Sequence, residues 1–203
     1  TVLQATFVAL TFAQAKETLF DGFYGNILSS PWFQEYHSCL DHVERRHGEK
    51  ELYQLNDTFV NYRHRRLMIY PAGPDKRILR GRTRFGAAID ELGWFPNDAA
   101  ADKNIKMNAN EVCTALENSL ATVAQAANLR LTEGFFDVPP SYFMNISSPS
   151  SVRDKIMELV RMSKHSNHIL GIHKPTWEMN PTLPRDCPFI EKKYKADPIA
   201  AER

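Results

Sequence analysis

The sequence lacks most of the features that would assign it to a special class of protein. Its 203 residues contain three cysteines, an odd number that argues against a disulfide framework and favours a reducing compartment. Basic and acidic residues nearly balance at a net charge of +1, which excludes a global field directed at nucleic acid or membrane. No apolar run approaches the length of a membrane span, and no signal-peptide pattern opens the chain.

What remains is the composition of an ordinary globular domain. Hydrophobic residues make up 43% of the chain and charged residues 24%, and the length suits one good-sized domain. The chain opens at Thr1 without methionine and runs directly into strand-forming sequence. We therefore expect a fragment whose true N-terminus lies upstream.

Short apolar segments alternate with amphipathic ones along the chain. The short segments are rich in β-branched and aromatic residues, which predicts strands, and the amphipathic ones have helical spacing. This alternation predicts an α/β fold, a mostly parallel sheet covered by helices on both faces. Strands are expected at 5–10, 57–62, 66–73, 85–89, 142–146 and 168–172, helices at 11–28, 34–50, 108–131 and 151–164, and a basic loop at 76–84.

Two adjacent carboxylates, Asp90 and Glu91, directly follow the apolar run 85–89. Ligands of such sheets bind outside the carboxyl ends of the strands, and Ser147 follows another strand at the same kind of position. Adjacent acids there suit nucleotide hydrolysis, the first helping to hold Mg²⁺ and the second deprotonating the attacking water. The alternative is a strand end capped by two solvated acids.

The surrounding residues resemble the ATPase domain of large terminase subunits, the DNA-packaging motors of tailed bacteriophages. Residues 5–36, ATFVALTFAQAKETLFDGFYGNILSSPWFQEY, look like the strand and helix that follow the phosphate loop in that family. The stretch ILRGRTRFGAAIDELGWF (78–95) looks like its Walker B segment. MNISSPSS (144–151) looks like its coupling motif, and PTWEMNPTLPRD (175–186) like the segment after the sheet core.

The resemblance implies a P-loop NTPase fold of the ASCE type. The ATPase core would span 1–174, and 175–203 would be a lid or linker leading toward a nuclease domain that this sequence lacks. The family also needs a Gly-rich Walker A loop, but no G-x-x-x-x-G-K-[ST] pattern occurs in the 203 residues. We therefore expect the chain to lack the Walker A strand and loop and to be inactive alone.

The resemblance also implies roles for individual residues in ATP hydrolysis. Asp90 would help to hold Mg²⁺, and Glu91 would be the catalytic base. Arg80, in the sequence LRG, best matches the arginine that reaches the γ-phosphate of a neighbouring subunit, although a solvated basic loop explains it equally well. Ser147 and Ser148 would sense the nucleotide, a role compatible with helix capping.

On this interpretation the full protein hydrolyses ATP with Mg²⁺ to drive double-stranded DNA into a procapsid. It would form a homo-oligomeric ring on the portal protein, with the small terminase subunit as a further partner. It would act in the host cytoplasm, docked transiently on the procapsid, and without a membrane. Two alternatives stay open: another nucleic-acid-dependent P-loop ATPase such as a helicase, and a non-catalytic α/β binding or scaffolding module.

Overall fold

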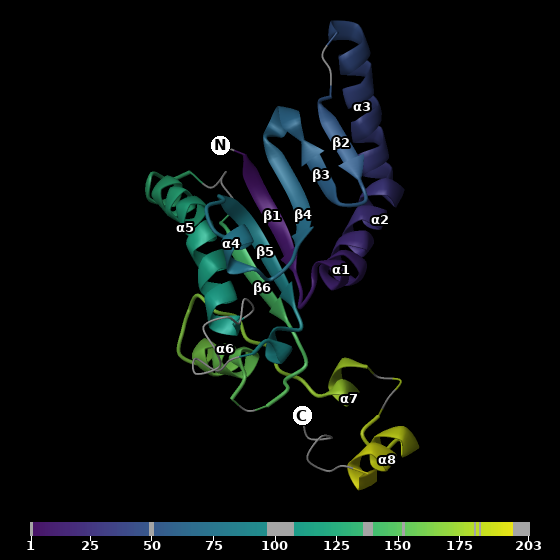
Figure 1. Cartoon of the computed structure of the whole chain (residues 1–203), viewed down its shortest axis with the longest axis vertical. Helices are drawn as coiled ribbons and strands as arrows, with labels where there is room; N and C mark the ends of the chain where they lie inside the picture. Colours follow the sequence, from purple (N-terminus) through teal and green to yellow (C-terminus); the bar gives the residue numbers. More distant parts are fainter. Residues whose placement is uncertain are drawn as a thin grey trace.

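A six-stranded mixed sheet forms the centre of the molecule, seen in a computed structural model that describes residues 2–48, 51–96, 108–135, 140–151, 153–180, 182 and 184–196 (Figure 1). Its strands are β1 (Leu3–Val8), β2 (Tyr53–Asn56), β3 (Phe59–Tyr62), β4 (Leu67–Ala72), β5 (Arg84–Asp90) and β6 (Tyr142–Ile146). They lie in the order β2-β3-β4-β1-β5-β6. β4, β1, β5 and β6 are parallel, whereas β2 and β3 are antiparallel, so the predicted mostly parallel α/β sheet is confirmed.

One face of the sheet is covered by the long helix α5 (Ala109–Thr132), with the short α4 (Lys76–Leu79) beside it (Figure 1). Successive strand residues point to opposite faces, so alternate residues of β1 and β5 meet α5. Val8, Ile89 and Leu116 are fully buried in this core. None of the helices in the described part of the chain is both long and apolar enough to cross a membrane.

The start of α5 follows the prediction, with one difference. The Asn108 side chain caps the helix and accepts hydrogen bonds from the backbone N–H groups of Asn110 and Glu111. The Glu111 carboxylate, whose position three residues after the N-cap would suit a capping box, accepts instead from the Lys76 ammonium of α4 at 2.7 Å. This ion pair ties α4 to α5, within a segment that was predicted to be a plain basic loop.

The opposite face of the sheet is covered over β1 to β4 but not over β6. The covering elements are α1 (Phe12–Gln14), a π-helical turn (Ala15–Phe20), α2 (Asp21–Ser29) and α3 (Pro31–His47), and they pack on β1 to β4 (Figure 1). No described helix covers β6 on this side, where Tyr142, Met144 and Ile146 are about half exposed. The expected cover on both faces is therefore wrong for β6.

The first helix begins as predicted but then changes its register. Thr11 caps it, accepting a hydrogen bond from the backbone N–H of Gln14 at 3.1 Å. The π-helical turn that follows, Ala15–Phe20, adds one residue to the helical repeat. As a consequence Phe20 is fully buried, and not Leu19, which the α-helical spacing had placed on the apolar face.

The strand predicted at 168–172 does not form. This segment follows α6 (Lys155–Ser163) and is irregular, with Leu170 87% and Ile172 68% exposed. A strand needs a neighbouring strand for its backbone hydrogen bonds, and the described sheet ends at β6. Beyond it the described residues form two helices, α7 (Thr176–Met179) and α8 (Pro188–Ala196), which lie apart from the sheet (Figure 1).

Two boundaries in the first half of the chain also differ from the prediction. The helix expected over 34–50 begins at Pro31, since proline is well suited to a first helical turn, and it ends at Gly48 in a left-handed conformation. The short strand β2 was not predicted. It pairs with β3 across a tight turn in which the Asn56 side chain accepts from the backbone N–H groups of Thr58 and Phe59.

Candidate functional site

The carboxyl ends of the parallel strands meet at one edge of the sheet, and the two acids lie there. Asp90 is the last residue of β5, and Glu91 opens the short 3-10 helix η3 (Leu92–Trp94). β6 ends beside them, because Asp90 is in register with Ile146 and Ser147 comes next. The prediction that Glu91 and Ser147 lie at the same edge of the sheet is confirmed.

Asp90 is held on one side by a residue of the π-helical turn. The Thr18 hydroxyl lies 3.0 Å from Asp90 Oδ2. Asp90 Oδ1 makes no hydrogen bond to any of the described residues. One carboxylate oxygen is therefore oriented by the protein, and the other remains available to a ligand.

Glu91 has an unusual backbone and an unusual electrostatic environment. Its φ of 59° and ψ of 34° are left-handed, which costs a non-glycine residue about 1–2 kcal/mol. The side chain is half-buried, and this burial, together with the neighbouring charge of Asp90, raises the pKa of the Glu91 carboxyl. With this left-handed backbone the chain turns at Glu91 and does not continue as an extended segment. Backbone strain of this kind is concentrated at functional sites.

The turn after Glu91 is tied to the end of β6 through Gly93. The Gly93 N–H donates to Ser147 Oγ at 2.9 Å, and Ser150 Oγ donates to the Gly93 carbonyl at 2.5 Å. A Cβ on Gly93 would lie 2.8 Å from the Ser148 carbonyl oxygen. Asp154, the N-cap of α6, accepts from the Ser150 N–H at 2.6 Å. Only glycine allows the two strand ends to approach this closely.

A shallow cavity of about 410 Å³, wide open to solvent, lies between these strand ends and the first helix. Glu91 and Ser148 line it, whereas the Ser147 hydroxyl donates to the Ser148 carbonyl and is engaged in the turn. The remaining lining residues were not predicted: Leu10, Gln14 and Trp94. The Gln14 side chain makes no hydrogen bond within the described part of the chain, so its amide is free to meet a ligand.

The structure does not bring Arg80 to the acids. Arg80 is exposed in the turn before β5, at the amino end of a strand that is about 20 Å long. There it lines a separate cavity of about 170 Å³ beside α5. Arg84, expected in the same basic loop, is fully buried instead and donates to Thr6 Oγ1, the Leu79 carbonyl and the Tyr70 hydroxyl.

Five site residues escaped the sequence analysis: Leu10, Gln14, Thr18, Gly93 and Trp94. Gln14 and Thr18 belong to the helix that leaves the carboxyl end of β1, the strand next to β5. That position alone would have predicted Gln14, since the first turn of such a helix borders the ligand edge. Thr18 depends on the π-helical turn, which no sequence pattern announced.

The oxygen atoms of the site suit a magnesium ion whose remaining ligands are water and phosphate oxygens. Among the described residues no cluster of three or more histidine, cysteine or carboxylate side chains could hold a metal. Mg²⁺ in phosphate-transfer sites needs only one or two carboxylates, because water and substrate phosphates supply the other ligands. Asp90 Oδ1 and the Ser148 hydroxyl are both hard oxygen atoms of the kind that such an ion prefers; Ser148 lines the cavity, whereas Asp90 is not among its lining residues.

A model of one protein family matches residues 3–203, and its description is "Uncharacterized protein MJ0330, N-terminal P-loop domain". The chain belongs to this family. No curated protein and no solved structure matches the chain. Membership places the chain among P-loop domains, whose general property is the binding of nucleoside triphosphates, typically with Mg²⁺.

The connection after β1 does not form a phosphate loop. Only residues 9–11 separate β1 from α1, and none of them is glycine. The nearest lysine, Lys16, donates to Asp21 at 3.0 Å and lies 3.9 Å from Asp57. A phosphate cradle needs a longer Gly-rich turn and a free ammonium group, and this connection offers neither.

Proposed function

We propose that this chain is the hydrolytic part of a P-loop ATPase, in which Asp90 acts on Mg²⁺ and Glu91 on the attacking water. The observation that carries the proposal is the state of Glu91. Its carboxylate lines a cavity at the ligand edge of the sheet, its pKa is raised, and its backbone is left-handed. A solvated acid at a strand end would need none of these features.

Each residue of the site would have a distinct task. Asp90, fixed at Oδ2 by Thr18, would direct Oδ1 toward the cation. A bound Mg²⁺ would offset the negative charge of the β- and γ-phosphates. Glu91 would take one proton from water as the water oxygen bonds to the γ-phosphorus and the bond to ADP breaks. A raised pKa suits this step, since a general base works best when its pKa approaches the working pH.

The phosphate loop itself would come from a strand outside these 203 residues, paired with the free edge of β6. β6 has β5 on one side and no described strand on the other, whereas β2, at the opposite edge, is separated from β5 by three strands. A strand on β6, with its helix, would cover the half-exposed Tyr142, Met144 and Ile146. It would also give the apolar segment 168–172 a neighbour with which to pair.

The test is ATP hydrolysis by the full-length protein that contains this chain. Glu91→Gln should retain ATP binding while turnover falls about 10²-fold or more, within the range for loss of a general base. Glu35→Gln is the matched control, because Glu35 is exposed on α3, outside the site. The proposal fails if the wild-type protein binds no ATP, or if Glu91→Gln hydrolyses ATP as fast as Glu35→Gln.

We further propose that the ATPase serves viral DNA packaging, as the large terminase subunit. The support is the order of the sequence segments: the strand and helix at 5–36, the Walker B-like 78–95, the hydroxyl-rich 144–151 and the final 175–186. Double-stranded DNA, the portal protein and the small terminase subunit are the partners in this proposal, and Arg80 serves the neighbouring subunit of a ring. DNA-stimulated ATP hydrolysis by the full-length protein tests this proposal, because a non-catalytic scaffolding module would hydrolyse no ATP. Packaging into procapsids would separate a terminase from a helicase.

A further inference from the structure

The π-helical turn Ala15–Phe20 interrupts a helix that begins and ends regularly. Such turns are rare, and they occur frequently at functional sites. In this one the fully buried Ala15 and Phe20 are five residues apart, so the turn anchors to the core at both ends. Between them Glu17 and Thr18 are exposed on the outer side, whereas Lys16 and Leu19 are partly buried.

The Thr18 hydroxyl lies between two acceptors that compete for one proton. Its Oγ1 is 2.9 Å from the Gln14 carbonyl oxygen and 3.0 Å from Asp90 Oδ2. The bond to a carbonyl four residues earlier is an ordinary local interaction of threonine in helices. The bond to Asp90 joins residues 72 positions apart and is charge-assisted, which makes it the stronger of the two.

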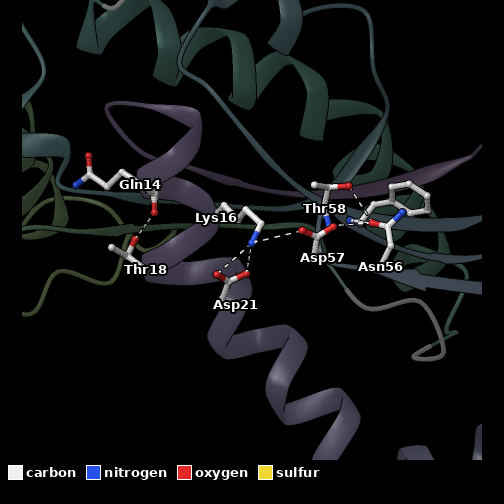
Figure 2. A network of polar contacts seen from close by, with 8 residues as sticks. Gln14, Lys16, Thr18, Asp21, Asn56, Asp57 and Thr58 are labelled. Carbon is white, nitrogen blue, oxygen red and sulfur yellow. Dashed lines mark hydrogen bonds and ion pairs between the residues drawn. The ribbon is translucent and has the colours of Figure 1, made fainter.

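A second polar network fixes the other side of the same turn (Figure 2). The Lys16 ammonium donates to both oxygens of Asp21, at 3.0 and 3.3 Å, and lies 3.9 Å from Asp57. Asp57 lies in the turn between β2 and β3, next to Thr58, whose hydroxyl donates to Asn56 Oδ1. The turn is thus held between the β2–β3 connection and the end of β5, which limits its freedom to move away from Asp90.

We infer that Thr18 is a positioning residue of the nucleotide site: it holds Asp90 Oδ2 so that Oδ1 is presented to the Mg²⁺ of a bound nucleotide. The inference rests on the proposed function. An aspartate has two free torsions, and a carboxylate without a partner would rotate and spread its charge over several directions. The added residue of the π-helical turn brings Thr18 over the strand end while Phe20 keeps the helix on the core.

The experiment measures how strongly Mg²⁺ enhances ATPγS binding to the full-length protein, as the ratio of the Kd without Mg²⁺ to the Kd with Mg²⁺. Thr18→Val keeps the branched shape and removes the hydroxyl. It should lower the ratio about 3- to 10-fold, as expected for one lost hydrogen bond. Thr18→Ser retains the hydroxyl and should restore the ratio to within about 2-fold of wild type. Thr18→Ala, a second deletion of the hydroxyl, should behave as Thr18→Val does.

The matched control is Thr132→Val, which removes an exposed hydroxyl hydrogen bond to the Leu129 carbonyl at the end of α5, outside the network that holds the turn. Its ratio should equal that of the wild type. Equal ratios in wild type, Thr18→Val and Thr18→Ala would overturn the role of Thr18 while leaving the proposed function intact. A loss in Thr18→Ser as large as that in Thr18→Val would also overturn it. A wild-type protein without Mg²⁺-dependent ATPγS binding would instead refute the proposed function.

Discussion

Replacing Gly93 by alanine should destabilise the protein, because the new methyl group has no room. The added Cβ would lie 2.8 Å from the Ser148 carbonyl oxygen and 2.9 Å from Ser147 Oγ, closer than the 3.0 Å that real Cβ contacts respect. The nearer atom belongs to the backbone, so it cannot swing aside as the end of a flexible side chain would. The turn after Glu91 would have to separate from the end of β6.

The size of this effect follows from one steric clash that is introduced and one hydrogen bond that is lost. Overpacking at a close contact costs about 1–3 kcal/mol, and the hydrogen bond from the Gly93 N–H to Ser147 contributes about 1 kcal/mol. The sum, about 2–4 kcal/mol, corresponds to a fall in Tm of about 4–16 °C for a chain of this size. Urea unfolding at constant m value measures it directly.

The same substitution at Gly25 provides a control of opposite sign. Gly25 lies in the exposed middle of α2, where an added Cβ meets nothing within 4 Å. Gly25→Ala should therefore stabilise the protein by about 0.5–1 kcal/mol, through the higher helix propensity of alanine. The reasoning fails if Gly93→Ala lies within about 0.5 kcal/mol of wild type, or if both variants shift stability in the same direction.

Three further predictions concern charged residues. Burial and the charge of Asp90 raise the pKa of Glu91 above its ordinary value of 4.5, so the free energy of unfolding falls as the pH rises from 4.5 to the raised value. Glu91→Gln cannot ionise and should therefore unfold at a higher urea concentration than the wild type at about pH 7.5. Near pH 4 the two proteins should unfold at about the same urea concentration. Arg84→Leu should lower the free energy of unfolding in urea by about 3 kcal/mol or more, because three buried acceptors lose their hydrogen-bond donor. Arg84→Lys should not restore this loss, since an ammonium group cannot replace the planar guanidinium that reaches all three acceptors. Wild-type stability in either variant would contradict this prediction. Arg80→Ala should leave ATPγS binding by isolated subunits unchanged, and mixing it with Glu91→Gln subunits should recover ATP hydrolysis in assembled rings; no recovery after assembly would refute a role across the subunit interface.

The sequence predicted where the two strand ends meet better than it predicted the geometry around them. The apolar runs before Asp90 and Ser147 predicted two strands, and the parallel pairing of β5 and β6 brings their carboxyl ends together by necessity. Helix capping by Thr11 and Asn108 is local chemistry, which a sequence can show, whereas the helix expected from residue 151 begins only at Lys155, with Asp154 as its N-cap. These features were predictable because each depends on neighbours along the chain.

The remaining features depend on contacts between distant segments. The turn at Ala15–Phe20 arises because Phe20 packs in the core, and the resulting contact between Thr18 and Asp90 spans 72 residues. Gly93 is required by a close approach of two strand ends that no local pattern reveals. Arg84 was expected in a wet basic loop, yet three tertiary acceptors bury it. The segment 168–172 is apolar enough for a strand but has no described partner.

The most direct measurement is a structure of the full-length protein with bound ATPγS and Mg²⁺. The account predicts that Mg²⁺, or a water of its shell, contacts Asp90 Oδ1, and that the γ-phosphate faces Glu91 across the cavity that Ser148 and Gln14 line. A nucleotide bound elsewhere on the sheet, with Asp90 and Glu91 both facing solvent, would contradict it.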